Sequence, residues 1–362
     1  MINKIAYWVA FSRVPGIGRV RLAQLEQHFG DLAAAWRAPV AQLREAGLDS
    51  RTADSVEKVR PAISLDDELA LLEKYHVTAL TYHDRGYPSR LKEIYDYPPV
   101  LFVRGQLTPD DERCVAVVGT RRATIYGKQV AGDMATGLAR SGVTVASGLA
   151  RGIDTVAHRS SLDAGGRTVA VFACGLDTVY PAENTALARD IMEHGALISE
   201  YPLGVRPKAD HFPRRNRILS GMSLGVLVVE AGEGSGAIIT ALQANEQDRE
   251  VFAVPGSILS PASKGSNRLI QEGAKLVTDY RDILGELNLT MAAEQLEMKE
   301  VLASNEAEAA MLTYVSAEPA HIDEICRKSG LPASSVSSTL AIMELKGLVR
   351  QVSGNNYVLT KR

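Results

Sequence analysis

The chain has 362 residues, too many for one typical domain of roughly 100 to 200 residues, so two or three domains with separate cores are predicted. Its composition, 46% hydrophobic and 23% charged, excludes the disordered and collagen-like classes. The formal net charge of -3 excludes a uniformly basic protein, so any nucleic-acid surface must come from local clusters of Lys and Arg.

The three cysteines are Cys114, Cys174 and Cys326. Their odd number and the lack of a C-x-x-C spacing argue against a disulfide framework and a zinc site, and predict a reducing compartment. An apolar run over 5–11 leads into Arg13 without an A-x-A cleavage pattern, so we interpret it as an amphipathic first helix. No stretch of the sequence approaches the roughly 18 apolar residues that span a bilayer. Together these features predict a cytoplasmic protein without a membrane partner.

Residues 1–65 are predicted to form a small helical domain of SAM or helix-hairpin-helix type. Apolar residues recur at helical spacing over 5–11 and 22–29, and the segment VPGIG lies between them. The segment 43–59 repeats the pattern of helix, glycine turn and helix in weaker form. Two interpretations of VPGIG stay open: its N–H groups grip a DNA phosphate, or the module packs against protein.

Residues 66–288 are predicted to form an extended Rossmann-like domain with its core at 112–288. It begins with a helix over 66–75 and a short extended stretch over 77–82. The Pro- and aromatic-rich segment 88–105 is interpreted as a connecting element.

From Cys114 onward, short β-branched runs closed by Gly or Pro alternate with helical segments, which is typical of βα units on a parallel sheet. The runs are apolar throughout, as expected where helices cover both faces. The seven predicted strands span 115–118, 143–147, 168–173, 196–200, 225–230, 251–255 and 275–278. The fold class is therefore α/β, with a Rossmann-like, doubly wound, mainly parallel sheet.

A Glu- and Ala-rich linker is predicted over 289–305 and a winged helix over 306–362. Its three helical segments, around 306–317, 321–329 and 333–346, precede two strand-like runs whose G-N-N junction predicts a hairpin wing. The predicted recognition helix has several Ser and only one cation, Lys346, so a partner protein is at least as good a candidate ligand as duplex DNA.

The loops that follow the predicted strands are rich in small residues. In an open parallel sheet, ligands bind at these loops, where backbone N–H groups and helix N-termini can hold an anion. The alternative is that glycines such as Gly119, Gly148 and Gly236 merely permit tight turns. No loop is a P-loop or a G-x-G-x-x-G fingerprint, so neither nucleotide hydrolysis nor a dinucleotide cofactor is predicted.

The densest basic cluster lies between the fourth and fifth predicted strands. Residues 206–217 hold five Lys or Arg against one acid, Asp210, with His211 and Phe212 among them. Cations that neutralise phosphates beside a ring that stacks on a base are typical of single-strand binding. A solvated charged face is the alternative, which Phe212 and Pro213 inside the run disfavour. The predicted nucleic-acid-binding residues are Gly119, Arg121, Arg122, Ser147, Gly148, Arg151, Lys208, His211, Phe212, Arg214, Arg215, Asn216, Arg217 and Gly236.

Asp154 and His158, four residues apart on a predicted helix, could serve general acid–base chemistry. We favour the alternative of a helix-capping Asp and a hydrogen-bonded structural His. For Asp177 and Glu200, turn chemistry is likewise the favoured interpretation. No catalytic residue, metal site or cofactor is therefore predicted.

Seven segments in fixed order, VAVVGTR, SGLARGIDTVAH, ACGLDTVYP, LISEYP, HFPRRNRILSGMS, EAGEGSGAIITA and VFAVPG, closely resemble the DNA-processing protein A (DprA, or Smf) family. The resemblance covers about 100–290. It implies a non-enzymatic protein that protects incoming single-stranded DNA in natural transformation. It also implies a homodimer formed through the Rossmann domain and the loading of a RecA-type recombinase for homologous recombination.

The family's DNA pocket carries over residue by residue onto Arg121, Phe212, Arg214, Asn216 and Arg217. A lysine that some members have before the Phe has no exact counterpart, since Ala209 stands three residues before Phe212 with Lys208 beside it.

The alternative function is a nucleotide-processing enzyme. The segment EAGEGSGAIITA is superficially similar to loops of Rossmann-fold nucleoside-monophosphate phosphoribohydrolases. Those enzymes are expected to have a second acid in the helix that follows this loop. Here the first acid of that helix is Glu246, far from the turn, so single-strand binding is favoured.

Overall fold

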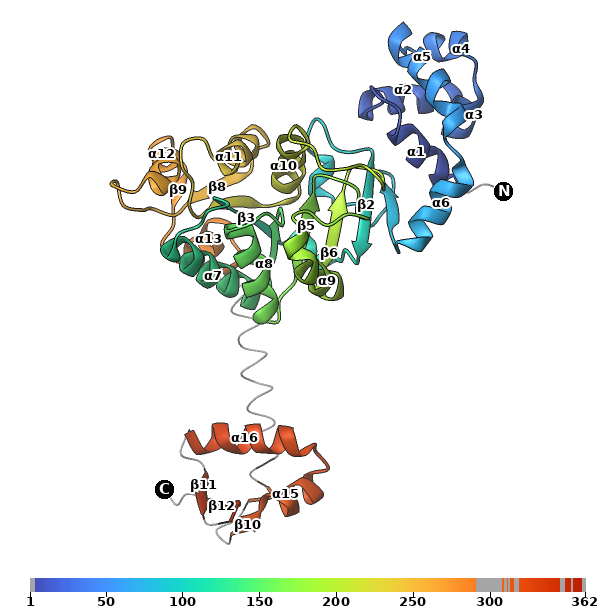
Figure 1. The fold of residues 1–362 in the computed structure, drawn as a ribbon. Helices are drawn as coiled ribbons and strands as arrows, with labels where there is room; N and C mark the ends of the chain where they lie inside the picture. Colours follow the sequence, from blue (N-terminus) through green and yellow to red (C-terminus); the bar gives the residue numbers. More distant parts are fainter. Residues whose placement is uncertain are drawn as a thin grey trace. The chain divides into compact units, whose positions relative to one another are not determined.

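The computed structural model describes residues 4–290, 308, 311, 313–315, 319–345, 349–352 and 354–359. The chain divides into two compact units, Met1–Thr290 and Met291–Arg362 (Figure 1). Among the described helices, none combines the length and apolar character that a membrane span requires.

The first unit begins with a helical part. Its helices are α1 (Ile5–Ser12), α2 (Arg19–Phe29), α3 (Leu32–Arg37), α4 (Val40–Glu45), α5 (Ser50–Val59) and α6 (Leu65–Lys74). The side chains of Asp31, Asp49 and Ser64 cap α3, α5 and α6 by accepting backbone N–H groups. Gly16 and Gly47, which precede α2 and α5, have positive φ. These two left-handed turns are why the helix, glycine turn, helix pattern occurs twice.

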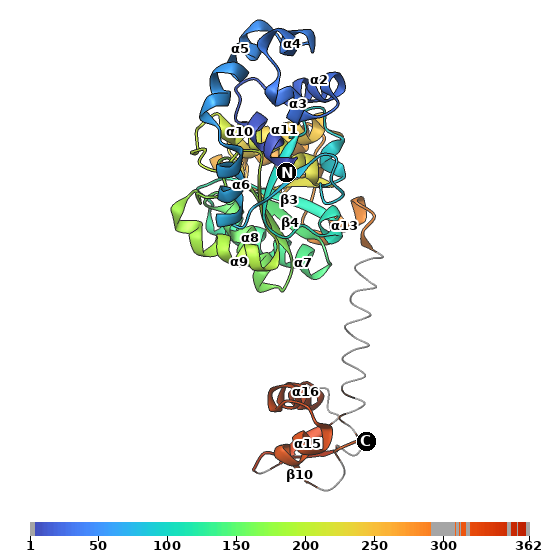
Figure 2. The ribbon, with the colours of Figure 1, turned by 90° about the vertical axis from the view of Figure 1, so that its right-hand side faces the viewer.

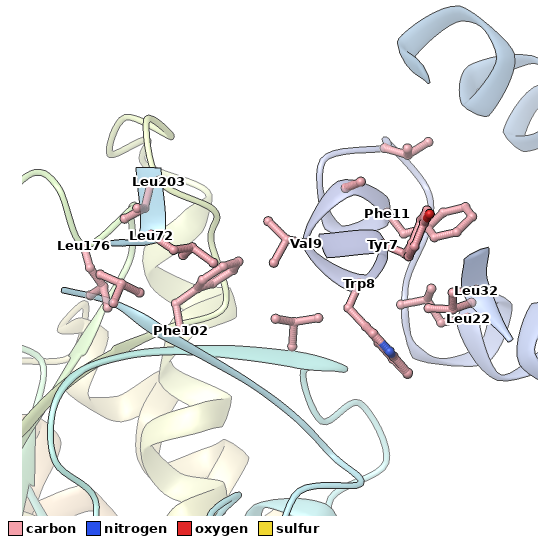
Figure 3. Close-up of a cluster of buried hydrophobic side chains, with 14 of the residues drawn as sticks. Tyr7, Trp8, Val9, Phe11, Leu22, Leu32, Leu72, Phe102, Leu176 and Leu203 are labelled. Carbon is pink, nitrogen blue, oxygen red and sulfur yellow. The ribbon is translucent and has the colours of Figure 1, made fainter. Parts of the chain in front are cut away.

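The helical part and the sheet share one hydrophobic core. In Figure 3, Val9 of α1 points toward Leu72 and Phe102, whereas Phe11 points to the opposite side of the helix. Residues 6–11 are all buried, so the expectation of an amphipathic first helix was wrong. The helix is apolar all round because it packs on the other N-terminal helices with one face and on the sheet domain with the other. The boundary predicted at residue 65 therefore runs through a shared core.

The sheet of the first unit has the strand order β1-β2-β6-β5-β4-β3-β7-β8-β9. The strands are β1 (Thr78–Thr81), β2 (Val100–Gly105), β3 (Cys114–Val118), β4 (Thr144–Ser147), β5 (Thr168–Phe172), β6 (Ala196–Ser199), β7 (Gly225–Val228), β8 (Glu250–Ala253) and β9 (Lys275–Leu276). β2 pairs antiparallel with β1 and β6, and the other neighbours are parallel. All seven predicted strands are present in this sheet.

The sheet also contains two strands that were not predicted as such. The segment 88–105 was interpreted as a connecting element, but it includes β2, whose residues 100–103 are buried inside the sheet. The apolar run from Val100 is short and follows prolines and tyrosines, so the sequence did not indicate a strand. The run is extended in the structure because it pairs with β6. The extended stretch over 77–82 contains β1, the edge strand beside β2.

Helices cover both faces of the sheet, as the apolar strands require. They are α7 (Ile125–Arg140), α8 (Ile153–Asp163), α9 (Thr185–His194), α10 (His211–Met222), α11 (Gly236–Glu246), α12 (Lys264–Gln271) and α13 (Tyr280–Glu286). Figure 2 shows α10 and α11 on one side of β3 and β4, and α7, α8 and α9 on the other. Short 3₁₀ helices lie at Arg60–Ala62, Arg90–Lys92, Pro109–Glu112, Ala182–Asn184 and Pro261–Ser263.

The order of the strands places a switch point between β3 and β7. From β3 the chain builds β4, β5 and β6 in one direction, then crosses through α10 to β7 and builds β8 and β9 in the other. Loops on either side of such a point diverge and leave a crevice at the carboxyl ends of the strands. The predicted Rossmann-like, doubly wound fold is thereby confirmed.

The second unit has the elements of a winged helix: β10 (Ala320–His321), α15 (Ile322–Ser329), α16 (Ala333–Leu345), β11 (Val349–Val352) and β12 (Asn356–Leu359). Its sheet has the order β10-β12-β11. Gly354 and Asn355, both with positive φ, turn the chain between β11 and β12, which confirms the predicted hairpin. Lys346, linker residues 291–305 and most of the segment 306–317 lie outside the described residues.

Candidate nucleic-acid interface

A pocket of about 570 Å³ opens at the switch point between β3 and β7. The loop after β3, the start of α10 and the loop before α11 form its walls. Of the fourteen residues predicted from the sequence, it brings together Gly119, Arg121, Arg122, Phe212, Arg215, Asn216 and Gly236.

The loop after β3 is held in place by a carboxylate that the sequence analysis did not single out. Glu230 lies two residues after β7 and is 2% exposed. Its carboxylate accepts hydrogen bonds from the backbone N–H and hydroxyl of Thr124, at 2.9 and 2.7 Å. Gly127 makes room for this carboxylate, because a Cβ there would lie 2.4 Å from Glu230 Oε2. Gly119 lets the loop pass close to the backbone, because a Cβ there would lie 2.5 Å from the Ile153 side chain and 2.9 Å from the Glu230 carbonyl oxygen. The position of Glu230 directly after an apolar run was the available signal.

Arg121 and Phe212 meet at the mouth of the pocket. The guanidinium carbon of Arg121 lies 5.1 Å from the centre of the Phe212 ring, within the range of a cation–π contact. The ring of Tyr180, 45% exposed, lies 5.7 Å from the Phe212 ring. Arg122 is exposed beside this group. The sequence analysis missed Tyr180, which sits in a loop after β5 that was expected to lie at this edge.

The opposite wall offers open backbone. α11 begins at Gly236, and a Cβ at Gly234 or Gly236 would meet no atom within 4 Å. Packing therefore does not require glycine at these two positions, in contrast to Gly119. Their small size leaves room for a ligand beside the N-terminus of α11, where a partial positive charge favours an anion.

Arg215 lines the pocket but is buried, and its guanidinium holds neighbouring backbone in place. It is 5% exposed, and its Nη1 donates to the carbonyl oxygens of Gly148, at 2.9 Å, and of Val171. Its Nε donates to Oδ1 of the neighbouring Asn216 at 3.1 Å. A Cβ at Gly148 would lie 2.3 Å from the guanidinium, so glycine is needed there. Arg215 thus ties α10 to the loop after β4 and to β5.

Asp154 completes this buried network. Its Oδ2 accepts the N–H groups of Gly148 and Ala150 at 3.1 and 3.2 Å. Burial raises the pKa of the Asp154 carboxyl, and the charge of Arg215 opposes that rise. Asp154 is the second residue of α8, whose N-cap is Gly152, so it holds the preceding loop rather than capping the helix as expected.

Several other predicted residues make their hydrogen bonds within the protein. The buried Ser147 hydroxyl donates to the Val117 carbonyl at 2.7 Å. The ring of His211 stacks on Tyr201, with centroids 4.2 Å apart, and its Nδ1 lies 3.1 Å from the carbonyl oxygen of Ala173. Arg151 is exposed and pairs with Glu183 at 2.7 Å.

The remaining basic residues do not lie with Arg121. The Arg217 side chain, 15% exposed, pairs with Glu200 at 2.6 Å and with Asp96 at 2.9 Å. Burial raises the pKa of Glu200, an effect that Arg217 opposes. Arg214 is exposed and lines a second cleft with Arg217, while Lys208 is exposed before α10. The expected single groove is therefore divided by the first turn of α10.

His158 has a structural environment. It is fully buried, and its Nδ1 lies 2.6 Å from the hydroxyl oxygen of Thr168. Asp177 accepts the Gly204 N–H at 2.7 Å, so it joins the loop after β5 to the loop after β6 rather than closing a local turn as expected. Within the described parts of the chain, no group of three or more His, Cys, Asp or Glu side chains is arranged to hold a metal ion.

We expect His158 to make folding less favourable as the pH falls below about 6.5. Burial, aided by the charge of Arg215, lowers the pKa of His158 to about 3, from about 6.5 for an exposed histidine. Between these values the unfolded chain binds a proton that the folded protein does not. Each unit of pH lost there removes about 1.4 kcal/mol from the free energy of unfolding.

Urea unfolding at several pH values from about 4.5 to about 7.5 measures this dependence. The variant His158→Gln keeps a hydrogen-bonding group near Thr168 but cannot titrate, so its free energy of unfolding should depend less on pH. The same pH slope in both proteins would show that His158 has no such effect.

Comparison with known proteins identifies the family of the chain. A family model described as DNA recombination-mediator protein A matches residues 78–288, and one described as DprA winged helix domain matches residues 297–355. Protein Smf of Escherichia coli (strain K12) is 37% identical, over 95% of this chain and 95% of its own length.

Two solved structures are also similar. The X-ray structure of DNA processing protein A from Streptococcus pneumoniae covers 79% of this chain and 98% of its own, with 36% identity and a TM-score of 0.67. A structure that addresses the single-stranded DNA binding mode of DNA processing protein A from Helicobacter pylori covers 59% of this chain and 96% of its own, with 28% identity and a TM-score of 0.53. The chain therefore belongs to the DNA recombination-mediator protein A family, which includes the DprA and Smf proteins.

Proposed function

We propose that this chain binds single-stranded DNA in the pocket between β3 and β7. The observation that carries the proposal is the contact of Arg121 with Phe212 at the mouth of a pocket whose far wall is open glycine backbone. The Helicobacter pylori relative, whose structure concerns single-stranded DNA binding, supports it.

The pocket's chemistry suits an unpaired strand. Arg121 and Arg122 neutralise phosphates, while the rings of Phe212 and Tyr180 offer faces on which bases stack. Backbone N–H groups at the start of α11 hold a further phosphate. Buried hydrogen bonds hold the loops that carry these contacts, and they involve Ser147, Gly148, Asp154 and Arg215. In this proposal Arg215 acts as a positioning residue rather than as a phosphate ligand.

We propose a binding role without a cofactor rather than catalysis. Asp154 is the only acid among the described lining residues, and two backbone N–H groups engage its carboxylate. The described residues of α11 place their first acid, Glu246, at the end of the helix, away from the pocket. Released base on incubation with nucleoside monophosphates would favour the phosphoribohydrolase alternative instead.

Titrating the full chain with a labelled, unstructured oligonucleotide and with a duplex of the same length tests single-strand binding. We expect tighter binding of the single strand and an affinity that falls as salt rises, with a logarithmic slope of about -0.7 per phosphate contacted. Equal affinity for both DNA forms, or binding insensitive to salt, would contradict the proposal.

Membership in the family supports a finer role. We propose that the protein acts as a homodimer, through its Rossmann-like domain, to protect incoming strands and load a RecA-type recombinase in natural transformation. This role implies a cytoplasmic protein. Light scattering measures the dimer, and recombinase filament formation on a strand coated with single-strand-binding protein measures loading. If the protein is a monomer and does not speed filament formation, the finer role is wrong and only the proposal of strand binding stands.

A further inference from the structure

A second cleft, of about 760 Å³, separates α2 from α10. Its walls include the turn before α2 with the first residues of that helix (16–21), the segment 95–100 that leads into β2, and Arg214 and Arg217 of α10. Figure 1 shows α2 on the side of the helical part toward the sheet domain. The VPGIG segment, which the sequence left between DNA contact and packing, thus borders a cleft. A Cβ at Gly18 would meet no atom within 4 Å.

The cleft combines aromatic rings with a cation. The guanidinium carbon of Arg19 lies 4.9 Å from the centre of the Tyr97 ring and 5.2 Å from that of Tyr95. Tyr95 is 82% exposed, although tyrosine has a large apolar ring. The Nε of Arg19 is buried and has no hydrogen-bond partner among the described residues. Arg19 and Tyr95 therefore present a charge and a stacking surface together, as the pair of Arg121 and Phe212 does in the first pocket.

Two of the four arginines in the cleft make no ion pair with a described carboxylate. Four arginines line it against three carboxylates, Asp49, Asp96 and Glu200. Arg21 pairs with Asp49 at 2.6 Å, and Arg217 pairs with both of the other carboxylates. In the described part of the chain, Arg19 and Arg214 have no such carboxylate partner. An anion can therefore bind between them without breaking an ion pair.

The two clefts are neighbours across one turn of helix. Phe212 lines the first pocket and Arg214 lines the second cleft, and both lie in the first turn of α10. No acidic residue lies within that turn, and the carboxylate next to it is that of the N-cap residue, Asp210, which makes no side-chain hydrogen bond to the helix. A strand that leaves Phe212 needs to cross only this turn.

We propose that the cleft between α2 and α10 is a second subsite for the same single strand. One unpaired base stacks on Tyr95, and a phosphate lies between Arg19 and Arg214. The inference rests on the proposed function, because the first pocket supplies the strand that continues into the cleft. It assigns the helical part a direct role in DNA binding.

The test compares oligothymidylates of about 6 and about 20 nucleotides on the full chain, since one site of this kind holds roughly 4 to 16 nucleotides. We expect Tyr95→Ala to weaken binding of the longer strand about tenfold, as the loss of one stacked base does, and to change binding of the shorter strand less than about twofold. Tyr95→Phe should restore the affinity, because it keeps the stacking face. Arg281→Ala, which removes an exposed arginine over a tyrosine on α13, is the matched control for Arg19→Ala.

The outcomes separate the subsite from the proposed function. Photocrosslinking of an iodouracil-labelled 20-mer to Tyr95, together with the length-dependent loss, supports the subsite. Unchanged 20-mer affinity in Tyr95→Ala and Arg19→Ala overturns it, even if Phe212→Ala abolishes binding. Equal losses for both lengths also overturn it, because the cleft would then not be a separate extension. If the unmodified chain binds neither strand, the proposed function fails as well.

Discussion

Replacing Phe212 by alanine should weaken binding of an unstructured single strand by about tenfold to a hundredfold, the effect of losing one stacked base. The ring carries the cation–π contact with Arg121 and lies beside Tyr180, so its loss removes the centre of the group at the pocket mouth. Fluorescence anisotropy with a labelled oligonucleotide measures the change. Circular dichroism and urea unfolding should show that the variant keeps its fold, because Phe212 is only partly buried.

The charge-reversing variant Arg121→Glu should weaken binding at least as much and lower the salt slope by about one contact. Arg189→Glu is the matched control: this exposed arginine lies on α9, outside the pocket lining. Affinity that stays unchanged in both Phe212→Ala and Arg121→Glu, or that falls equally in Arg189→Glu, would place the DNA somewhere else.

Replacing Arg215 by alanine should lower the free energy of unfolding by about 3 to 5 kcal/mol, the range for removing one partner from a buried charged network. The variant leaves the carbonyl oxygens of Gly148 and Val171 without their donor and removes the positive charge that opposes the raised pKa of Asp154. Urea denaturation of the full chain, followed by circular dichroism, measures the loss.

The variant Arg214→Ala is the control for Arg215→Ala, because it removes an arginine from the neighbouring position of α10. Arg214 is exposed, so its replacement should change stability by less than about 0.5 kcal/mol. If Arg215→Ala were as stable as Arg214→Ala and instead lost only DNA affinity, Arg215 would be a DNA ligand rather than a scaffold residue.

Much of the fold could be predicted because its physical signals are local. The strands β3 to β7 are short runs that are buried at every position, and burial on both faces explains why apolar and polar residues do not alternate in them. β2 escaped prediction because its apolar run begins directly after Pro98 and Pro99, and because one of its two partners, β6, is almost a hundred residues away. Strand pairing over that separation leaves no periodic mark on the sequence.

The candidate site could be predicted as a region but not as a set of contacts. The basic cluster at 206–217 and the loop after β3 do meet at one sheet edge. The sequence could not separate Arg214 from Arg215, since the difference depends on carbonyl oxygens of β5 and of the loop after β4 that only the folded chain brings together. The same holds for Tyr180 and Tyr95, whose exposure is a tertiary property.

The packing of Val9 against Phe102 has a consequence for any strand that the protein holds (Figure 3). Because the helical part and the sheet domain share a core rather than a linker, α2 cannot move away from α10 without exposing apolar side chains to water. The number of nucleotides that fit between Phe212 and Tyr95 is then set by the core itself. A bound strand would have a constant spacing there whatever its sequence.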